Sequence, residues 1–404
     1  MRRLALLPFL AVAACSGSPS QAPASTPTTP PPTSASSAPA LQADSFAATS
    51  PAPTTSNSPI PKTHTFTVTT HETFDDPWAM AFLPGTDELV ITGRTGHVWL
   101  RSDDGVREVS GAPDAVVAGQ GGLGDIIPGP TFASDGQVYL SWVEGGDGGT
   151  SGAVVGTATL DVADAALSDV DVIWRQTPKV TGDGHFSHRL LIQGDHLFVS
   201  SGERQKMDPA QELDNNLGKI LRLTLDGGPA DGNPFQGEDS PIAQQFWSMG
   251  HRNVLGLALD DAGRLWATEM GPEGGDELNL IKPGLNYGWP AASNGSHYGG
   301  ADIPDHEPGD GFEPPKVWWN PSVSPGSLMI YRGDLFPAWK GDAFIGALSG
   351  QALIRVDLNG EDATPAEEWP MEARIRAVAE APDGAIWLLQ DGSGAKLLEL
   401  RPEN

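Results

Sequence analysis

Gly263-Arg264-Leu265-Trp266-Ala267 shows the pattern that decides the fold of this chain. A turn residue comes first, an apolar pair follows, and the side chains then alternate as they do along a short strand. An apolar run at residues 255–259 precedes the turn, so the unit predicts two short strands with a turn between them. The pattern recurs in five other places, at residues 87–91, 136–140, 195–199, 341–345 and 384–388. Such recurrence of one small unit is typical of a repeat architecture.

The six copies lie about 40 to 80 residues apart, which indicates loops of different lengths between similar units. Sustained helical periodicity is hard to find, and residues 162–173 are only a weak candidate for a helix. An all-β chain with many short strands and glycine-rich turns folds as a sandwich, a barrel or a propeller. The repeat favours a six-bladed β-propeller of four-stranded antiparallel blades.

The N-terminal region predicts export rather than folding. Arg2 and Arg3 precede a short apolar run at residues 4–13, as in a signal peptide. The run ends in Val12-Ala13-Ala14-Cys15, which resembles a bacterial lipobox. Cleavage there would leave Cys15 as a lipidated N-terminus; an ordinary secretory signal with a spare cysteine is the alternative. We therefore expect a lipoprotein signal peptide at residues 1–15 and a protein of the periplasm or cell envelope, anchored to the outer membrane.

Residues 16–62 are rich in Pro, Ser, Thr and Ala and nearly free of large apolar groups, so we expect a disordered linker there. The propeller then occupies residues 63–404. With 24 basic and 52 acidic side chains, the net charge is −28. Nucleic acid is therefore excluded as a partner, and a membrane is expected to be contacted through the lipid anchor only. An anionic ligand would need a local cationic pocket. Cys15 is the only cysteine, so the mature fold can have no disulfide.

Gly119-Gln120-Gly121-Gly122-Leu123-Gly124 matches a dinucleotide-binding fingerprint, which requires a helix directly after it. Pro128 and Pro130 exclude a helix of useful length. We expect a tight glycine loop that presents Gln120.

Gly184-His185-Phe186-Ser187-His188-Arg189 contains the best candidate for a general base. A histidine near neutrality can take a proton from an alcohol, and Glu203 could orient the His185 ring. A packed or surface histidine is the alternative. A zinc pair of His185 and His188 would lack an evident third ligand.

Three arginines suit the binding of anions. Arg252 lies in a glycine-flanked loop next to Asn253, where it could bind a carboxylate or oxyanion; an ion pair on the propeller face is the alternative. Arg374 and Arg376 alternate on a predicted strand, so both guanidinium groups should face the same side. They form a candidate anion clamp unless they lie on a solvated edge. Residues 269–279 add acidic side chains in a glycine-rich loop, as a hard cation requires; an acidic surface turn is the alternative.

Together these motifs resemble the glucose/sorbosone dehydrogenase family, the soluble pyrroloquinoline quinone (PQQ)-dependent aldose dehydrogenases. The resemblance runs in order from residue 77 to residue 400, and its most specific pieces are residues 247–253, 269–280 and 286–290. It implies PQQ over the axis of a six-bladed propeller. His185 would then be the catalytic base, Glu203 its acidic partner, and Arg252 a group near the quinone oxygens. The implied PQQ contacts are Gln120, Asn253, Trp319, Ser322, Arg374 and Arg376. Calcium beside PQQ would be bound by the carbonyls of Gly271 and Pro272, and a second, structural calcium by Glu277 and Tyr287.

Two departures from the family concern cofactor affinity. Ser349 stands where the family commonly has a lysine that contacts PQQ, and the aromatic before the Pro-Ser of the cofactor lid is displaced, so that Trp319 would substitute by a shift of one residue. The sequence thus predicts a PQQ- and calcium-dependent enzyme that oxidises aldoses to lactones and passes electrons to a cytochrome or a membrane quinone. A non-catalytic propeller that binds carbohydrate or protein is the main alternative. A metal-dependent hydrolase would need a central carboxylate cluster, of which the sequence shows no convincing sign.

Overall fold

The computed structural model describes residues 54–55 and 66–403. Cys15 and the expected signal peptide lie outside the described residues, as does nearly all of the expected linker. Within that linker, Thr54–Thr55 form a short strand, β1, that pairs in parallel with β20 (Val317–Trp319).

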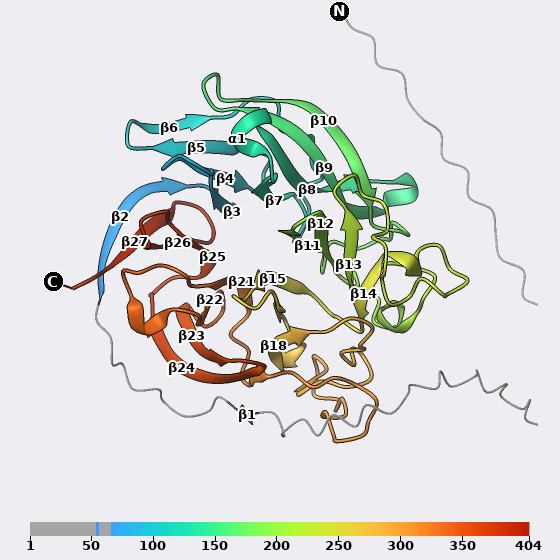
Figure 1. Ribbon diagram of the computed structural model, residues 1–404. Coiled ribbons are helices and arrows are strands. Elements are labelled where there is room, and N and C mark those ends of the chain that lie inside the picture. The colour runs from blue at the N-terminus through green and yellow to red at the C-terminus, as the bar shows by residue number, and fades with distance from the viewer. Residues whose placement is uncertain (1–53, 56–65, 404) are drawn as a thin grey trace, which may run out of the picture. The chain divides into compact units, whose positions relative to one another are not determined.

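The described chain forms six blades of four antiparallel strands around a common axis, and β1 adds a fifth, parallel strand to one of them (Figure 1). A separate two-stranded sheet consists of β17 (Glu273–Gly274) and β19 (Gly295–Ser296). The strands of the first three blades are β3 (Pro77–Phe82), β4 (Leu89–Gly93), β5 (Val98–Ser102) and β6 (Gly105–Glu108); β7 (Leu123–Pro128), β8 (Gln137–Gly145), β9 (Ser151–Asp161) and β10 (Ala166–Arg175); and β11 (Ser187–Gln193), β12 (His196–Ser201), β13 (Lys219–Thr224) and β14 (Phe246–Met249).

The remaining three blades follow the same order from the axis outward. Their strands are β15 (Val254–Leu259), β16 (Leu265–Glu269), β18 (Asp276–Ile281) and β20, extended by β1; β21 (Pro325–Ile330), β22 (Ala343–Ala347), β23 (Ala352–Asn359) and β24 (Asp362–Pro370); and β25 (Ile375–Glu380), β26 (Ile386–Gln390), β27 (Ala395–Pro402) and β2 (Phe66–Phe74). The prediction of a six-bladed β-propeller is confirmed.

Each copy of the sequence repeat forms the second strand of one blade, and the apolar run before it forms the innermost strand. The weak helix candidate at residues 162–173 is wrong, because β10 begins at Ala166 and pairs with β9. The sixth blade is assembled from both ends of the domain. Its outer strand β2 pairs with β27 from Phe66↔Pro402 to Phe74↔Ala395. This pairing closes the ring, because the first and last strands of the domain are joined in one sheet.

The hydrophobic core is divided among the six contacts between neighbouring blades. Residues such as Val90 and Leu140 pack between the first and second blades, and Phe344 and Leu388 between the fifth and sixth. Four other clusters fill the remaining contacts. Burial of each such side chain contributes roughly 1.5–3 kcal/mol, so the ring is stabilised mainly by apolar contacts between blades.

All six innermost strands have a register shift at their first residues, between Pro77/Ala79, Leu123/Ile126, Ser187/Leu190, Val254/Gly256, Pro325/Ser327 and Ile375/Ala377. Such irregularities bend a strand and redirect its side chains. Here they gather at one end of the axis, where the candidate site lies.

Candidate active site

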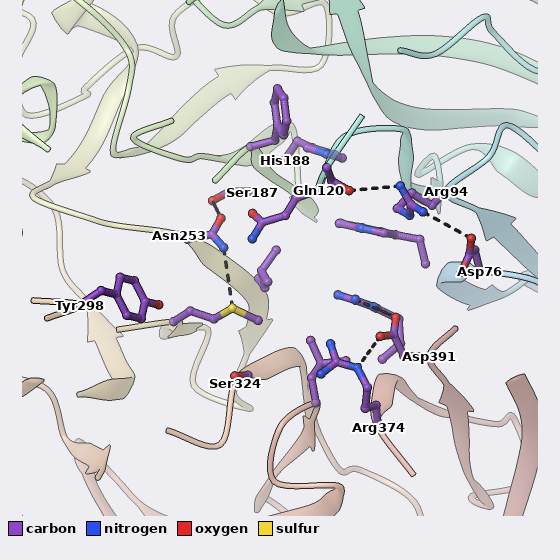
Figure 2. Close-up of a pocket in the computed structure, with 17 residues that line it drawn as sticks. Asp76, Arg94, Gln120, Ser187, His188, Asn253, Tyr298, Ser324, Arg374 and Asp391 are labelled. Atoms are coloured by element: carbon purple, nitrogen blue, oxygen red, sulfur yellow. Dashed lines mark hydrogen bonds and ion pairs between the residues drawn. The ribbon is translucent and has the colours of Figure 1, made fainter. Parts of the chain in front are cut away.

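A cavity of about 460 Å³ lies at the end of the axis where the innermost strands begin (Figure 2). Each blade or the loop leading into it contributes to its wall, with Trp78, Gln120, Ser187, Asn253, Ser324 and Arg376 as one example each. The volume lies within the usual range for a site that binds a small molecule.

Arg374 and Arg376 both line the cavity, as their alternation predicted, and both bind Asp391. Arg374 Nε lies 2.7 Å from one carboxylate oxygen and Arg376 Nη2 lies 2.7 Å from the other. Burial acts to raise the pKa of Asp391, but the two guanidinium groups outweigh it and lower the pKa below its usual range. The anion between the two arginines is therefore supplied by the protein itself.

Arg94 forms a third cationic part of the wall and pairs with Asp76 at 3.3 Å. Among the lining residues, three guanidinium groups against two carboxylates leave one net positive charge. A locally cationic pocket is thus present in a chain whose net charge is −28. Figure 2 shows Arg94, Arg374 and Asp391 on one side of the cavity and Tyr298 on the other.

Sequence reasoning missed Arg94, Asp391 and Met270, yet the repeat could have located them. Each directly follows the second strand of its blade, namely β4, β26 and β16, and each lines the cavity. Aligning the six repeats would therefore have marked this position as one that faces the axis. Tyr298 lies in an inserted loop with no repeat signal, and the residue is 74% exposed.

The segment that leads into β11 has an unusual backbone. His185, Ser187 and His188 all have positive φ values, of 50°, 57° and 56°. Such conformations are costly for residues other than glycine and gather at functional sites. The segment is supported by Gln120, whose Oε1 accepts a hydrogen bond from the backbone nitrogen of His185 at 2.7 Å. The expected glycine loop therefore does present Gln120, and β7 rather than a helix follows it.

His185 Nδ1 lies 2.5 Å from Oε1 of Glu203. The other carboxylate oxygen accepts hydrogen bonds from the backbone nitrogens of Lys206 and Met207, at 2.5 and 2.6 Å. Burial lowers the pKa of His185, and the hydrogen bond that the ring donates to Glu203 only partly offsets this effect, so the ring is neutral at pH 7. His185 is not itself one of the cavity's lining residues, although Phe186, Ser187 and His188 are.

His188 lines the cavity but is held as a structural group. Its ring stacks on Trp78 with centroids 5.0 Å apart, and Nδ1 lies 2.8 Å from the hydroxyl of Ser141. Complete burial lowers its pKa to about 3. Of the two histidines in the motif, only His185 therefore has a carboxylate that can stabilise a proton on the ring.

Arg252 lies beside the cavity, where its Nη1 donates to the carbonyls of Met270 and Gly271 at 3.1 and 2.5 Å. Its Nη2 reaches the hydroxyl of Tyr298 at 3.5 Å. Asn253 lines the cavity, and its Oδ1 accepts a hydrogen bond from the Ser187 hydroxyl at 3.1 Å. Pro272 is buried and lines neither this cavity nor the smaller void beside it.

A void of about 10 Å³, enough for one small ion or water, lies behind Arg252 and is lined by Glu269, Glu277 and Tyr287 among others. Burial and the charge of Glu269 raise the pKa of Glu277 well above its usual value. The Tyr287 hydroxyl is engaged by the carbonyl of Leu280 and the nitrogen of Lys282. Any contact of Tyr287 with a cation in the void would thus use its backbone carbonyl. No cluster of three or more His, Cys, Asp or Glu side chains that could hold a metal occurs in the described ranges.

Trp319 and Ser322, which were expected to contact PQQ, do not line the cavity. Trp319 is 3% exposed and packs in the hydrophobic core between the fourth and fifth blades, so it does not reach the cavity. The hydroxyl of Ser322 accepts from the backbone nitrogen of Gly274 at 3.1 Å. Ser349 is exposed, and its hydroxyl lies 2.7 Å from that of Ser324, which lines the cavity.

The sequence and the fold of this chain are both similar to those of known sugar dehydrogenases. The sequence model of the Glucose / Sorbosone dehydrogenase family matches residues 74–399. The chain belongs to the glucose/sorbosone dehydrogenase family. The aldose sugar dehydrogenase YliI of Escherichia coli is 38% identical over 339 residues, which cover 82% of this chain and 91% of that protein.

Two solved structures of aldose sugar dehydrogenases are similar to this chain over most of its length. The apo form of the soluble aldose sugar dehydrogenase of Escherichia coli has a TM-score of 0.80 at 36% identity, over 84% of this chain and all of that chain. The PQQ-bound aldose sugar dehydrogenase of Streptomyces coelicolor has a TM-score of 0.70 at 30% identity, over 85% of this chain and all of that chain. Across the described part of the chain, no helix has the length and hydrophobicity needed to cross a membrane.

Proposed function

We propose that this protein is a PQQ- and calcium-dependent aldose dehydrogenase that oxidises the anomeric carbon of a sugar to a lactone, with His185 as the general base. The observation that carries the proposal is the His185–Glu203 pair, at 2.5 Å, next to a cavity whose wall holds Arg94, Arg374 and Arg376. PQQ, when bound, supplies the quinone that accepts the hydride.

The chain's own residues account for the proton transfer. The Glu203 carboxylate accepts a hydrogen bond from Nδ1–H of His185, which leaves the lone pair of Nε2 as the site that takes the proton of the anomeric hydroxyl. Both carboxylate oxygens of Glu203 are held by hydrogen bonds, so the imidazole keeps one orientation. The negative charge of Glu203 stabilises the imidazolium that forms. Glu203 is therefore a positioning residue and His185 the catalytic one.

The cavity fits PQQ, a planar tricarboxylate. Arg374 and Arg376 would hold its carboxylates, although both also bind Asp391 and the net positive charge is only one. Gln120 and Asn253 would add polar contacts from the lining, and Arg252 would add positive charge beside it. Trp319 has no part in this proposal because it lies in the core.

Calcium fits the loop after β16 for electrostatic reasons. The Gly271 carbonyl oxygen accepts a hydrogen bond from Arg252 Nη1 at 2.5 Å, so it is oriented toward positive charge; calcium would be bound by this oxygen together with the Pro272 carbonyl. A second calcium would be held by Glu277 and Tyr287 in the small void. There Asn279 Nδ2 bridges Glu269 and Glu277 at 3.1 and 2.9 Å, and its buried Oδ1 has no partner among the described residues. A cation would offset the repulsion between these buried carboxylates.

We also propose export, with residues 1–15 as a lipoprotein signal, residues 16–62 as a linker and Cys15 as the lipid attachment point. A periplasmic or envelope location anchored to the outer membrane would allow electron transfer to a cytochrome or a membrane quinone. Metabolic labelling with a fatty acid that disappears in Cys15→Ser would support the anchor, and unchanged labelling would contradict it.

The decisive experiment is a titration of the purified full chain with PQQ at a fixed calcium concentration, followed by dye reduction with a panel of aldoses. The proposal expects saturable binding and sugar-dependent reduction that is lost in His185→Ala. A folded protein that does not bind micromolar PQQ would contradict it. Ser349 would then mark the loss of the cofactor site, and a propeller that binds carbohydrate or protein would be favoured.

A further inference from the structure

The glycine loop at residues 119–124, which matches a dinucleotide fingerprint without being one, wraps around Arg94. Nη1 of Arg94 donates to the carbonyls of Gly119 and Gly121 at 3.2 and 3.4 Å, and the Leu123 nitrogen donates to the Arg94 carbonyl at 3.0 Å. A Cβ on Gly122 would lie 2.1 Å from the Arg94 carbonyl oxygen and 2.7 Å from its Cγ. The missing side chain therefore allows the close approach of loop and arginine.

Arg94 has hydrogen-bonding capacity left for a ligand. Its three contacts, to Gly119, Gly121 and Asp76, are all 3.2 Å or longer, at the weak end of the usual range. Arg376, by contrast, contacts Asp391 at 2.7 and 2.9 Å. A guanidinium has five N–H donors. With its side chain 29% exposed on the cavity wall, Arg94 can turn donors toward a bound molecule.

The charges on the wall also favour an anion at this place. Arg94, Arg374 and Arg376 line one cavity with only Asp76 and Asp391 to balance them. Burial lowers the pKa of Arg376, and the nearby charges of Arg374 and Arg94 add to this effect. Three like charges around one cavity repel one another, and an anion bound between them would relieve that repulsion.

We propose that Arg94 is a third anion-binding arginine, held by the glycine loop, that binds a carboxylate of the cofactor together with Arg374 and Arg376. The inference rests on the proposed PQQ dependence and assigns a task to the one arginine of the wall that the sequence motifs did not mark. It also explains a glycine-rich motif that lies beside no nucleotide-binding helix.

The test uses the full chain and two probes, PQQ and its uncharged trimethyl ester, at fixed calcium. In Arg94→Gln the amide can still donate to the loop carbonyls but carries no charge. The matched control is Arg107→Gln, because Arg107 also forms a 3.3 Å ion pair and also donates to a backbone carbonyl, yet lies on β6 away from the cavity. We expect Arg94→Gln to weaken PQQ binding at least tenfold and ester binding less than twofold, and Arg107→Gln to change neither.

Each result has a distinct meaning. Wild-type affinity for PQQ in Arg94→Gln would overturn the inference and leave the proposed function intact. An equal loss of PQQ and ester binding would overturn it too, because Arg94 would then only hold the loop or the fold. A wild-type chain that binds the ester and not PQQ, or neither, would overturn the proposed cofactor and the role of Arg94 together.

Discussion

Two histidine–glutamate pairs occupy equivalent places in neighbouring blades, and only one suits catalysis. His185 and Glu203 in the third blade, and His251 and Glu269 in the fourth, each join Nδ1 to Oε1 across 18 residues, at 2.5 and 2.9 Å. Each histidine precedes the innermost strand of its blade, and each glutamate stands at or just beyond the end of the second strand. The repeat thus produces the same pair twice.

The pairs differ at the second ring nitrogen. His251 Nε2 lies 2.8 Å from the Ser248 hydroxyl, and its ring stacks on Tyr287 with centroids 4.7 Å apart. His185 Nε2 has no such partner within the described residues, and its side chain keeps 8% exposure beside the cavity. A carboxylate–imidazole pair therefore becomes a base only where the other nitrogen stays free, and serves as a structural crosslink where it is bound.

The largest expected effect tests this contrast directly. We expect His185→Gln to lower kcat by about 10²- to 10⁴-fold, because the proton acceptor is lost. His251→Gln should lower kcat far less and mainly reduce thermal stability, since it removes a buried hydrogen bond. Dye-reduction assays at saturating sugar would measure kcat, and thermal melts would measure stability. Comparable losses of kcat in both variants would contradict the assignment of His185 as the base and His251 as a structural group.

Glu203→Gln should reduce kcat by about tenfold or more while His185 remains in place, because the imidazolium loses its stabilising charge. The pKa of His185 is below 6.5 and Glu203 acts to raise it, so the variant's pKa should fall further. In the wild type, kcat/KM should rise with pH through the pKa of His185 and level off above 6.5. In the variant this rise should move to lower pH. A rise that does not move would show that Glu203 does not act through His185.

A substitution near the proposed PQQ site should change cofactor affinity without changing the pH dependence of catalysis. Ser349→Lys adds a cation next to Ser324 and should strengthen PQQ binding about tenfold, as one charge-assisted contact would. The kcat/KM–pH profile should keep its position, because His185 and Glu203 are unchanged. Equilibrium titration of the apo protein measures the first effect; unchanged affinity would show that a cation at this position does not reach the ligand.

His188 should affect stability and not catalysis. Burial lowers its pKa from the ordinary 6.5 to about 3 in the folded protein, so the unfolded chain binds more protons between these two pH values. Stability from this group is complete above pH 6.5 and falls by about 1.4 kcal/mol per pH unit as the pH drops toward 3. Denaturant unfolding between pH 7 and pH 5 should therefore depend less on pH in His188→Gln than in the wild type. Equal pH dependence in both would contradict the low pKa.

The sequence alone determined the propeller and the chemical types around its axis. Alternation and turn residues are local signals, so the second strands of all six blades could be predicted, as could the pairing of Glu203 with His185 and the shared face of Arg374 and Arg376. Only the tertiary structure decided that Asp391 binds both of these arginines at once and that Trp319 is buried in the core. These features depend on which side chains meet across neighbouring strands and on burial, and the order of residues along one strand does not show either.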